Sequence, residues 1–196
     1  MYKFSLILPM LFLMAYQGAA ISEPANFLPL PEKKQTPQAL YIDAKQAYKM
    51  KTGSPESVYF VDVRTQAEVE FLGMPTAVDS NIPYFTNDFS EWDTKKGRFI
   101  KTPNSNFSVA LEERLTEAGL NKDATILLMC RSGTRSARAA ALLNKLGYSK
   151  AYTVVDGYEG DIIKEGPNKG QRLKNGWKNA DLPWSYKLSE DKMYIE

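Results

Sequence analysis

The sequence predicts an α/β fold in which a mainly parallel central sheet is flanked by helices. Three short segments, residues 58–63, 125–129 and 151–155, are almost continuously aliphatic, β-branched or aromatic. Continuous apolar runs of this length are typical of parallel strands buried on both faces, whereas half-exposed strands alternate polar and apolar residues. Helical segments lie between these runs, and strands that alternate with helices form a layered fold.

Four helices are predicted around these strands, over residues 44–51, 68–72, 109–118 and 136–146. Asp43 is the expected N-cap of the first helix, and Ser108 that of the third. In the fourth helix, apolar residues recur with a spacing of three and four, which places them on one buried face. Gly119 and Gly147 are expected to end the third and fourth helices.

Two stretches fit the α/β pattern less well. Residues 84–107 form a long insert without regular periodicity, and it contains Phe85, Phe89, Trp92, Phe99 and Phe107. Long loops with large aromatic residues are typical of packed lids or substrate walls. Residues 163–196 are expected to form an ordered C-terminal wrap anchored by Trp177 and Trp184. Residues 21–39 contain four prolines and are expected to form an extended lead-in before a domain over residues 40–162.

The first 20 residues have the pattern of a secretory signal peptide. Lys3 precedes an apolar run, and Gly18 and Ala20 are small residues at the spacing that signal peptidase prefers. The run is too short to span a bilayer comfortably, and no second hydrophobic stretch follows. We therefore expect export to the periplasm or secretion, with no stable membrane insertion after the leader is removed. An uncleaved N-terminal anchor is the alternative.

The composition excludes several kinds of chemistry. The 25 basic and 23 acidic residues leave a net charge of +2, which provides no bulk attraction for nucleic acid. The sequence contains no histidine, so catalytic triads that depend on imidazole and most zinc sites are excluded. We expect neither a metal nor another cofactor. The single cysteine, Cys130, has no partner for an internal disulfide or a redox pair.

Cys130 lies where a thiol can be activated without a general base. It directly follows a predicted parallel strand, and ligands of open α/β sheets bind at the carboxyl ends of the strands. Gly133 allows the loop to curl so that its amides point at the sulfur, and the helix that begins at Ser136 adds a positive partial charge. Arg131 and Arg135 add full positive charges. A thiol in such surroundings can titrate at roughly 3.5–7.5 instead of about 8.5.

A thiolate of this kind is suited to the transfer of sulfur at the oxidation level of a persulfide. It attacks the outer sulfur of a donor such as thiosulfate, and sulfite leaves. Cys130 then carries a persulfide until an acceptor such as cyanide or a thiol removes the outer sulfur. Because the intermediate is covalent, double-displacement kinetics are expected.

Three motifs resemble those of the single-domain rhodaneses, the thiosulfate sulfurtransferase family. The first is Val61-Asp62-Val63-Arg64 followed by Ala67-Glu68, Gly73, Ala77 and Asn81-Ile82-Pro83. The second is the loop Cys130-Arg131-Ser132-Gly133-Thr134-Arg135-Ser136, and the third is Val154-Val155-Asp156-Gly157-Tyr158. The resemblance covers about residues 40–162 and implies a rhodanese-like three-layer fold. Two departures are Met74, where many members have a histidine, and Asp156-Gly157 in place of a double glycine.

The resemblance also implies roles for individual residues. Cys130 carries the persulfide, and a small anionic sulfur donor and a thiol or cyanide acceptor bind at the loop residues Arg131, Ser132, Gly133, Thr134, Arg135 and Ser136. The loop backbone cradles the persulfide, while the two arginines favour an anionic donor. Asp62, Arg64 and Glu68 are expected to support the site as one ion-pair network. A protein acceptor of sulfur is compatible with the same chemistry.

Three other interpretations compete with this one. Phosphatases with a low-pKa cysteine place five residues between the cysteine and the arginine of the loop, whereas four residues separate Cys130 from Arg135. A buried, inert thiol is disfavoured because the residues that follow Cys130 are polar or charged. The third is a non-catalytic rhodanese-like module, a persulfide carrier or partner-binding protein docked through the insert and the wrap. The intact Cys130 loop argues against an inactive module but does not separate a carrier from the enzyme, which is the leading hypothesis.

Overall fold

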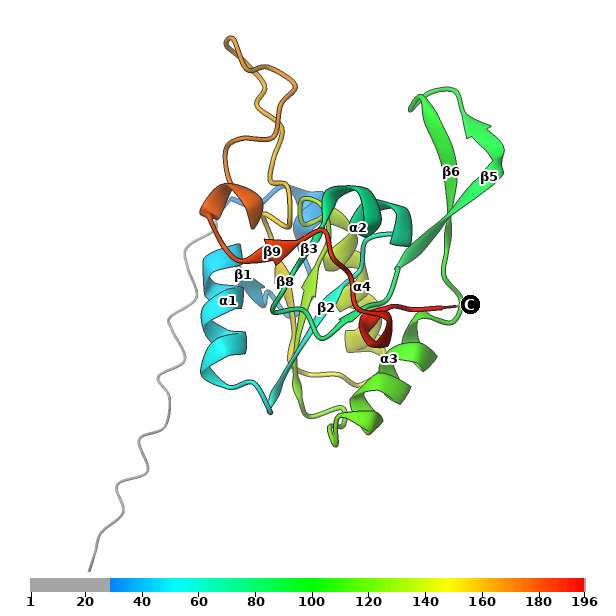
Figure 1. The fold of residues 1–196 in the computed structure, drawn as a ribbon, viewed down its shortest axis with the longest axis vertical. Helices are drawn as coiled ribbons and strands as arrows, with labels where there is room; N and C mark the ends of the chain where they lie inside the picture. The colour runs from blue at the N-terminus through cyan, green and yellow to red at the C-terminus, as the bar shows by residue number, and fades with distance from the viewer. Residues whose placement is uncertain (1–28, 196) are drawn as a thin grey trace, which may run out of the picture.

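A five-stranded parallel sheet in the order β1-β8-β7-β2-β4 forms the centre of the computed structural model, which describes residues 29–195 (Figure 1). Its strands are β1 (Tyr41–Ile42), β2 (Val58–Asp62), β4 (Ser80–Asn81), β7 (Thr125–Met129) and β8 (Ala151–Val154). The three longer strands coincide with the apolar segments, which confirms the predicted sheet. The sequence pattern does not predict β1 and β4, because a two-residue strand has no periodicity to detect.

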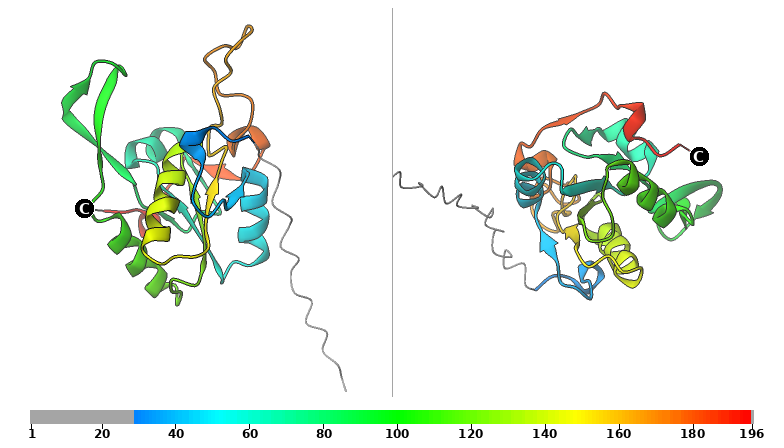
Figure 2. Two further views of the ribbon diagram at one scale, coloured as in Figure 1. Left: turned by 180° about the vertical axis from the view of Figure 1, so that it is seen from behind. Right: turned by 90° about the horizontal axis from the view of Figure 1, so that it is seen from below.

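Helices cover both faces of the sheet (Figure 1, Figure 2). They are α1 (Ala44–Gly53), α2 (Gln66–Leu72), α3 (Phe107–Glu117) and α4 (Thr134–Lys145). Alternate residues of β2 explain the layers: Tyr59 and Val61 pack with α3 and α4, whereas Phe60 packs with α1 and α2. Every residue of β2 is buried, as expected for a strand covered on both sides. The predicted three-layer α/β fold is therefore confirmed.

Two helices on the same face of the sheet begin with a capping box. The Asp43 side chain accepts the Gln46 amide, and the Gln46 side chain accepts the Asp43 amide, so the predicted cap of α1 is confirmed. Thr65 and Glu68 are paired in the same way at α2. Because Thr65 satisfies the first free N–H groups, α2 begins at Gln66, two residues before the predicted start.

The other two helices also begin earlier than predicted. Ser108 is not the cap of α3, because Phe107 is already helical and only 1% exposed. The Phe107 ring packs into the core, and this packing favours a helix that already begins at Phe107. α4 begins at Thr134 instead of Ser136, because Gly133 adopts the left-handed conformation at the N-cap with φ of 91°.

The insert contains a β-hairpin, so the prediction of an irregular segment over residues 84–107 was wrong. Its antiparallel strands are β5 (Phe85–Asp93) and β6 (Arg98–Pro103), and the register shifts between Asp88 and Trp92. Phe99 makes edge-on contacts with Phe89 and Trp92, at centroid distances of 5.1 and 5.2 Å. These cross-strand contacts stabilise the pairing. The hairpin stands away from the rest of the protein (Figure 1, Figure 2).

The later part of the C-terminal segment packs against the domain, whereas its first part, around residues 164–171, is exposed and projects from the domain as a loop (Figure 1). Trp177 is fully buried and packs on Phe60 at a centroid distance of 5.5 Å. Trp184 begins β9 (Trp184–Ser185), which pairs antiparallel with β3 (Met74–Pro75). A Cβ at Gly73 would approach the Trp184 ring to 2.7 Å, so the wrap requires a glycine there. Both tryptophans therefore anchor this segment.

The lead-in is only partly described. Residues 29–39 include the 3-10 turn η1 (Glu32–Lys34), so this part is not extended throughout. Lys34 is buried, and its ammonium donates to the carbonyl oxygen of Val155 and to Asp161. The expected leader, residues 1–20, lies outside the described residues. Between residues 29 and 195, no helix has the length and apolar character needed to cross a bilayer.

Candidate active site

Cys130 directly follows β7 and lies beneath the loop that leads into α4. We call residues 130–136 the Cys130 loop. Cys130 is 2% exposed, yet it forms part of the wall of a pocket of about 830 Å³. We call this the Cys130 pocket. Its walls come from the Cys130 loop, the β5–β6 hairpin, Glu68 of α2 and Arg172 of the C-terminal segment. Cys130 is thus almost fully buried, yet it belongs to the wall of a cavity.

A backbone amide of the loop points at the sulfur. The Gly133 amide donates to Sγ over 3.2 Å, and the backbone of Ser132 and Ser136 lies close enough to lower the pKa of the thiol. Burial raises the pKa of the Cys130 thiol. The charge of Arg135 and the polar groups of Ser132 and Ser136 lower this pKa, and together they outweigh the effect of burial. The pKa of Cys130 therefore lies below its ordinary value, so a larger fraction of this thiol is ionised than in an ordinary cysteine.

The hydroxyl of Ser136 is fixed behind the sulfur. Thr153 of β8 donates to Ser136 Oγ over 2.8 Å, and Ser136 donates to the Gly133 carbonyl over 3.1 Å. Its oxygen lies 3.7 Å from Cys130 Sγ. This chain is fully buried, so it holds the first turn of α4 against the sulfur. Ser136 and Gly133 lie behind the sulfur, while Arg131, Ser132, Thr134 and Arg135 line the Cys130 pocket.

Arg135 is held by an ion pair that joins α4 to α2. Its two terminal nitrogens donate to the Glu68 carboxylate over 2.6 and 2.5 Å. Lys101 of β6 lies 3.6 Å from the same carboxylate. Burial raises the pKa of Glu68, but the hydrogen bonds and charge of Arg135 outweigh it and hold that pKa well below its usual range. Arg135 is therefore a permanent cation beside the thiol, and burial does not remove its charge.

Asp62 and Arg64 form a separate, fully buried ion pair. Arg64 donates to both oxygens of Asp62, and its terminal nitrogen also donates to the Gly73 carbonyl. Within residues 29–195, neither residue bonds to Glu68, so the expectation of one network that includes Glu68 was wrong. The reason is geometric: Glu68 lies in the first turn of α2 and faces Arg135. A supporting role for Asp62 and Arg64 stays a prediction.

The third motif packs against the Cys130 loop. A Cβ at Gly157 would lie 2.5 Å from the carbonyl oxygen of Cys130, so only a glycine fits. The Tyr158 amide donates to that carbonyl over 2.8 Å, and the Tyr158 ring stacks under Arg64. Asp156 accepts the amides of Ala44 and Gly176, each at 3.0 Å. The turn after β8 therefore links the loop to α1 and to the C-terminal segment.

Basic side chains line the Cys130 pocket beyond those that the sequence indicates. They come from η1, the hairpin, α4 and the C-terminal segment, and they are Lys33, Lys96, Arg98, Lys101, Arg138 and Arg172. Sequence reasoning missed them because they are scattered over the chain and no local motif marks them. The aromatic insert was predicted as a substrate wall, and the hairpin does line the pocket, with Phe85 and Ile100 among its apolar residues.

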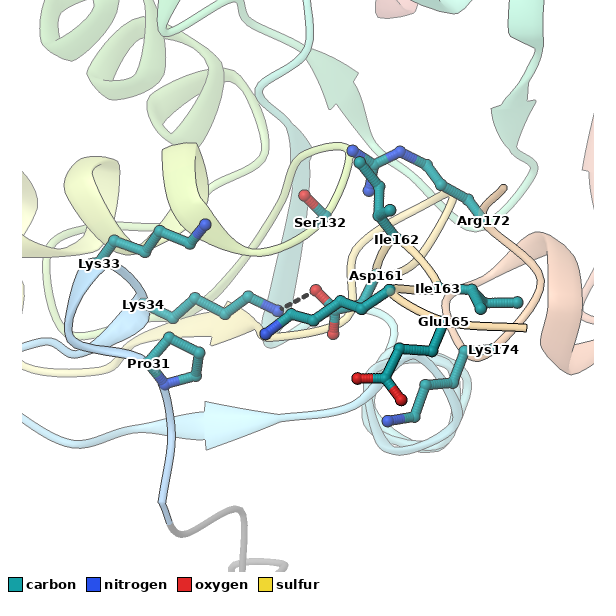
Figure 3. Close-up of a pocket in the computed structure, with 11 residues that line it drawn as sticks. Pro31, Lys33, Lys34, Ser132, Asp161, Ile162, Ile163, Glu165, Arg172 and Lys174 are labelled. Carbon is teal, nitrogen blue, oxygen red and sulfur yellow. Dashed lines mark hydrogen bonds and ion pairs between the residues drawn. The ribbon is translucent and has the colours of Figure 1, made fainter. Parts of the chain in front are cut away.

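A second pocket of about 870 Å³ adjoins the first (Figure 3). The two share Lys33, Ser132, Ile162 and Arg172 in their walls. In this second pocket the Lys34 ammonium points at Asp161, and the two lining residues form an ion pair of 2.7 Å. Within residues 29–195, no group of three or more carboxylate, thiol or imidazole side chains is placed to hold a metal ion. The expectation of no cofactor stays a prediction.

Comparisons with known proteins agree with this geometry. A family model described as the rhodanese-like domain matches residues 43–162, which include the Cys130 loop and the hairpin. The chain is 30% identical to a solved structure, Rv0390 from Mycobacterium tuberculosis, with a TM-score of 0.56 over 75% of this chain and 97% of that one. It is 29% identical over 145 residues to an uncharacterized protein of Rickettsia rickettsii, covering 74% of this chain and 96% of the relative. A second uncharacterized relative, from Rickettsia prowazekii, is 29% identical over 130 residues, which is 66% of this chain and 85% of the relative.

Proposed function

The chain belongs to the rhodanese-like domain family, and we propose that it is a sulfurtransferase that carries sulfane sulfur on Cys130. Family membership supports a sulfurtransferase-type or sulfur-carrier function. The finer proposal is transfer from thiosulfate, or a similar anionic donor, to cyanide or a thiol. The observation that carries it is the Cys130 sulfur, which accepts a loop amide beside Arg135 at the wall of a basic pocket.

The first half-reaction loads sulfur onto the enzyme. The Cys130 thiolate attacks the outer sulfur of thiosulfate, a new S–S bond forms to Sγ, and the S–S bond of the donor breaks. The bonding electron pair leaves on sulfite. The total charge is the same before and after, so no proton has to move. This explains how the reaction proceeds in a chain without histidine.

The second half-reaction returns the enzyme to its thiolate form. Cyanide, or a thiolate, attacks the outer sulfur of the persulfide and forms a bond to it. The S–S bond to Sγ breaks, and its electron pair returns to Cys130 as thiolate. The Gly133 amide, which already donates to Sγ, stabilises the thiolate that begins the first half-reaction and that the second half-reaction restores.

A non-catalytic persulfide carrier is the second candidate. The observation that favours it is the exposed aromatic surface of the hairpin beside the pocket, where Phe89 is 66%, Trp92 54% and Phe99 42% exposed. A partner protein could dock on such a surface. A carrier would load sulfur but turn over poorly with small acceptors, whereas an enzyme would turn over many times.

Intact mass spectrometry after thiosulfate treatment tests the proposal. The protein should gain the mass of one sulfur atom, lose it again with cyanide, and show no gain in Cys130→Ser. Multiple-turnover formation of thiocyanate from thiosulfate and cyanide then separates the enzyme from the carrier. Absence of a sulfur adduct on the unaltered protein would refute both candidates. We expect no activity on phosphate esters.

We also propose that the protein works outside the cytoplasm, in the periplasm or as a secreted protein. The proposal rests on the leader-like sequence of residues 1–20 alone. N-terminal sequencing of the protein recovered from the exported fraction tests it, and Ile21 is the expected first residue. An intact N-terminus on a membrane-bound protein would support the anchor instead.

A further inference from the structure

The Cys130 pocket carries more positive charge than transfer between thiosulfate and cyanide requires. Eight basic side chains line it, whereas the acidic side chains are Glu68 and Asp93. Its volume of about 830 Å³ lies within the range of about 300–1,000 Å³ that is typical of sites for larger organic ligands. Thiosulfate and cyanide are far smaller. Both the charge and the size indicate a larger, anionic ligand.

Half of these basic side chains already have acidic partners. Arg135 and Lys101 share Glu68, Lys96 pairs with Asp93 at 3.0 Å, and Arg172 lies 3.8 Å from Glu159. In the part of the chain that the structure describes, the other four make no ion pair and no side-chain hydrogen bond. They are all exposed, and they are Lys33, Arg98, Arg131 and Arg138.

These four cations come from separate parts of the fold. Lys33 lies in η1, Arg98 at the start of β6, Arg131 in the Cys130 loop and Arg138 in α4. Like charges around one cavity repel each other, and a concave wall of one sign attracts a ligand of the opposite sign. Their convergence on one pocket therefore suits a ligand with several separate anionic groups.

The larger anionic ligand is best explained as the acceptor, which binds in the second half-reaction. A small donor needs only Sγ, the loop amide and Arg131 or Arg135. Once Cys130 carries a persulfide, the reactive sulfur lies about 2 Å further out, toward the pocket. An acceptor whose thiolate reaches this atom has to place the rest of its body against the pocket walls, where Arg98 and Arg138 lie.

We propose that the acceptor is a thiol compound with at least two anionic groups, and that Arg98 and Arg138 bind those groups. This inference rests on the proposed function. The acceptor thiolate forms a bond to the outer sulfur, the S–S bond to Sγ breaks, and its electron pair returns to Cys130. The acceptor leaves as a persulfide. The step transfers no proton and needs no oxidant or reductant.

Steady-state kinetics with matched acceptors test this inference on the full chain. With thiosulfate as donor, mercaptosuccinate (two carboxylates), 3-mercaptopropionate (one) and 2-mercaptoethanol (none) are compared at equal thiolate concentration. We expect kcat/KM to rise with the number of carboxylates, by about tenfold from none to two, and the preference to shrink as salt is added. Equal values for the three thiols, or the reverse order, would overturn the inference.

Two variants assign the preference to particular residues. The double variant Arg98→Gln with Arg138→Gln should lose most of the preference for mercaptosuccinate, chiefly through KM. Lys150→Gln removes a charge from an exposed residue at the opposite end of the sheet and should keep the preference in full. A preference that survives in the double variant would remove Arg98 and Arg138 from the account.

The same samples separate this inference from the proposed function. If Cys130 gains sulfur from thiosulfate but the three thiols are equivalent, the sulfurtransferase proposal stands and the anionic acceptor is wrong. If only an acidic protein accepts the sulfur, the small-molecule acceptor is wrong as well. If Cys130 gains no sulfur, the proposed function itself fails.

Discussion

The guanidinium of Arg135 meets the carboxylate of Glu68 through two hydrogen bonds of 2.6 and 2.5 Å beside the Cys130 thiol. A two-pronged pair of this kind fixes both position and plane of the guanidinium. Glu68 orients the cation but also offsets part of its field, and Lys101, 3.6 Å from the same carboxylate, offsets Glu68 in turn. The positive charge at Cys130 is therefore set jointly by α2, α4 and the hairpin.

Replacing Arg135 should slow the loading of sulfur. Arg135→Gln removes the cation that lowers the pKa of Cys130, so that pKa should rise and thiosulfate loading near neutral pH should slow, by about tenfold. The rate at which the sulfur adduct appears in stopped samples gives the measurement. Loading at the original rate would remove the electrostatic part of the account.

A double variant guards against simple unfolding. Arg135→Gln alone leaves the partly buried Glu68 without its hydrogen-bonded partner and with only Lys101 nearby, at 3.6 Å, which can destabilise the fold by up to about 3–5 kcal/mol. Adding Glu68→Gln removes the carboxylate charge. We expect the double variant to be more stable than Arg135→Gln in urea unfolding. It should load faster than Arg135→Gln, because the Glu68 charge no longer opposes the thiolate, but still more slowly than the unaltered protein. Loading by the double variant at the rate of the unaltered protein would contradict a role for the Arg135 charge.

A side chain at Gly157 should disrupt the Cys130 loop. Gly157 and Gly147 both have positive φ, 65° and 94°, but a Cβ at Gly157 meets the Cys130 backbone, whereas one at Gly147 meets nothing within 4 Å. Gly147→Ala should therefore cost only the conformational penalty of about 1–2 kcal/mol and leave loading intact. Gly157→Ala should cost more in thermal unfolding and abolish loading. Similar results for the two alanines would contradict the close contact.

Asp156 should make stability depend on pH in mildly acidic solution. Burial raises the pKa of Asp156 to about 6, whereas the unfolded chain titrates near about 3.9. Its ionisation therefore opposes folding, so this contribution to stability is greatest below about pH 4 and declines until about pH 6. The change should approach about 3 kcal/mol. Free energies of unfolding between these values should decline more steeply in the unaltered protein than in Asp156→Asn; parallel curves would argue against a buried, protonated Asp156.

The core of this fold is predictable because its signals are local. The segment 125–129 reads as a buried strand by itself, and the cysteine, glycine and arginines of the Cys130 loop lie within six residues of one another. Asp43 marks the start of α1 because it forms a capping box with Gln46, three residues later in the sequence. In each case the residues that determine the structure are neighbours in the sequence.

The features that the sequence misses depend on partners far away in the chain. β3 and β9 have two residues each. They form only because the backbone at Met74 and Pro75 pairs with that at Ser185 and Trp184, about 110 residues away in the sequence. Glu68 was assigned to the wrong network because its partner, Arg135, lies 67 residues away. The hairpin contains polar, aromatic and charged residues without strict alternation, so no periodic pattern distinguishes it from a loop.

The pH dependence of Cys130 alkylation tests the central claim most directly. The chain has one cysteine, so the rate of carbamidomethylation by iodoacetamide reports on that thiol alone. Only the thiolate reacts, and the midpoint of the rate profile gives its pKa even where the loop slows access. We predict a midpoint below about 8.5, rising in Arg135→Gln. A midpoint at or above that of an ordinary thiol would contradict the claim that the loop backbone and Arg135 lower the pKa of this thiol.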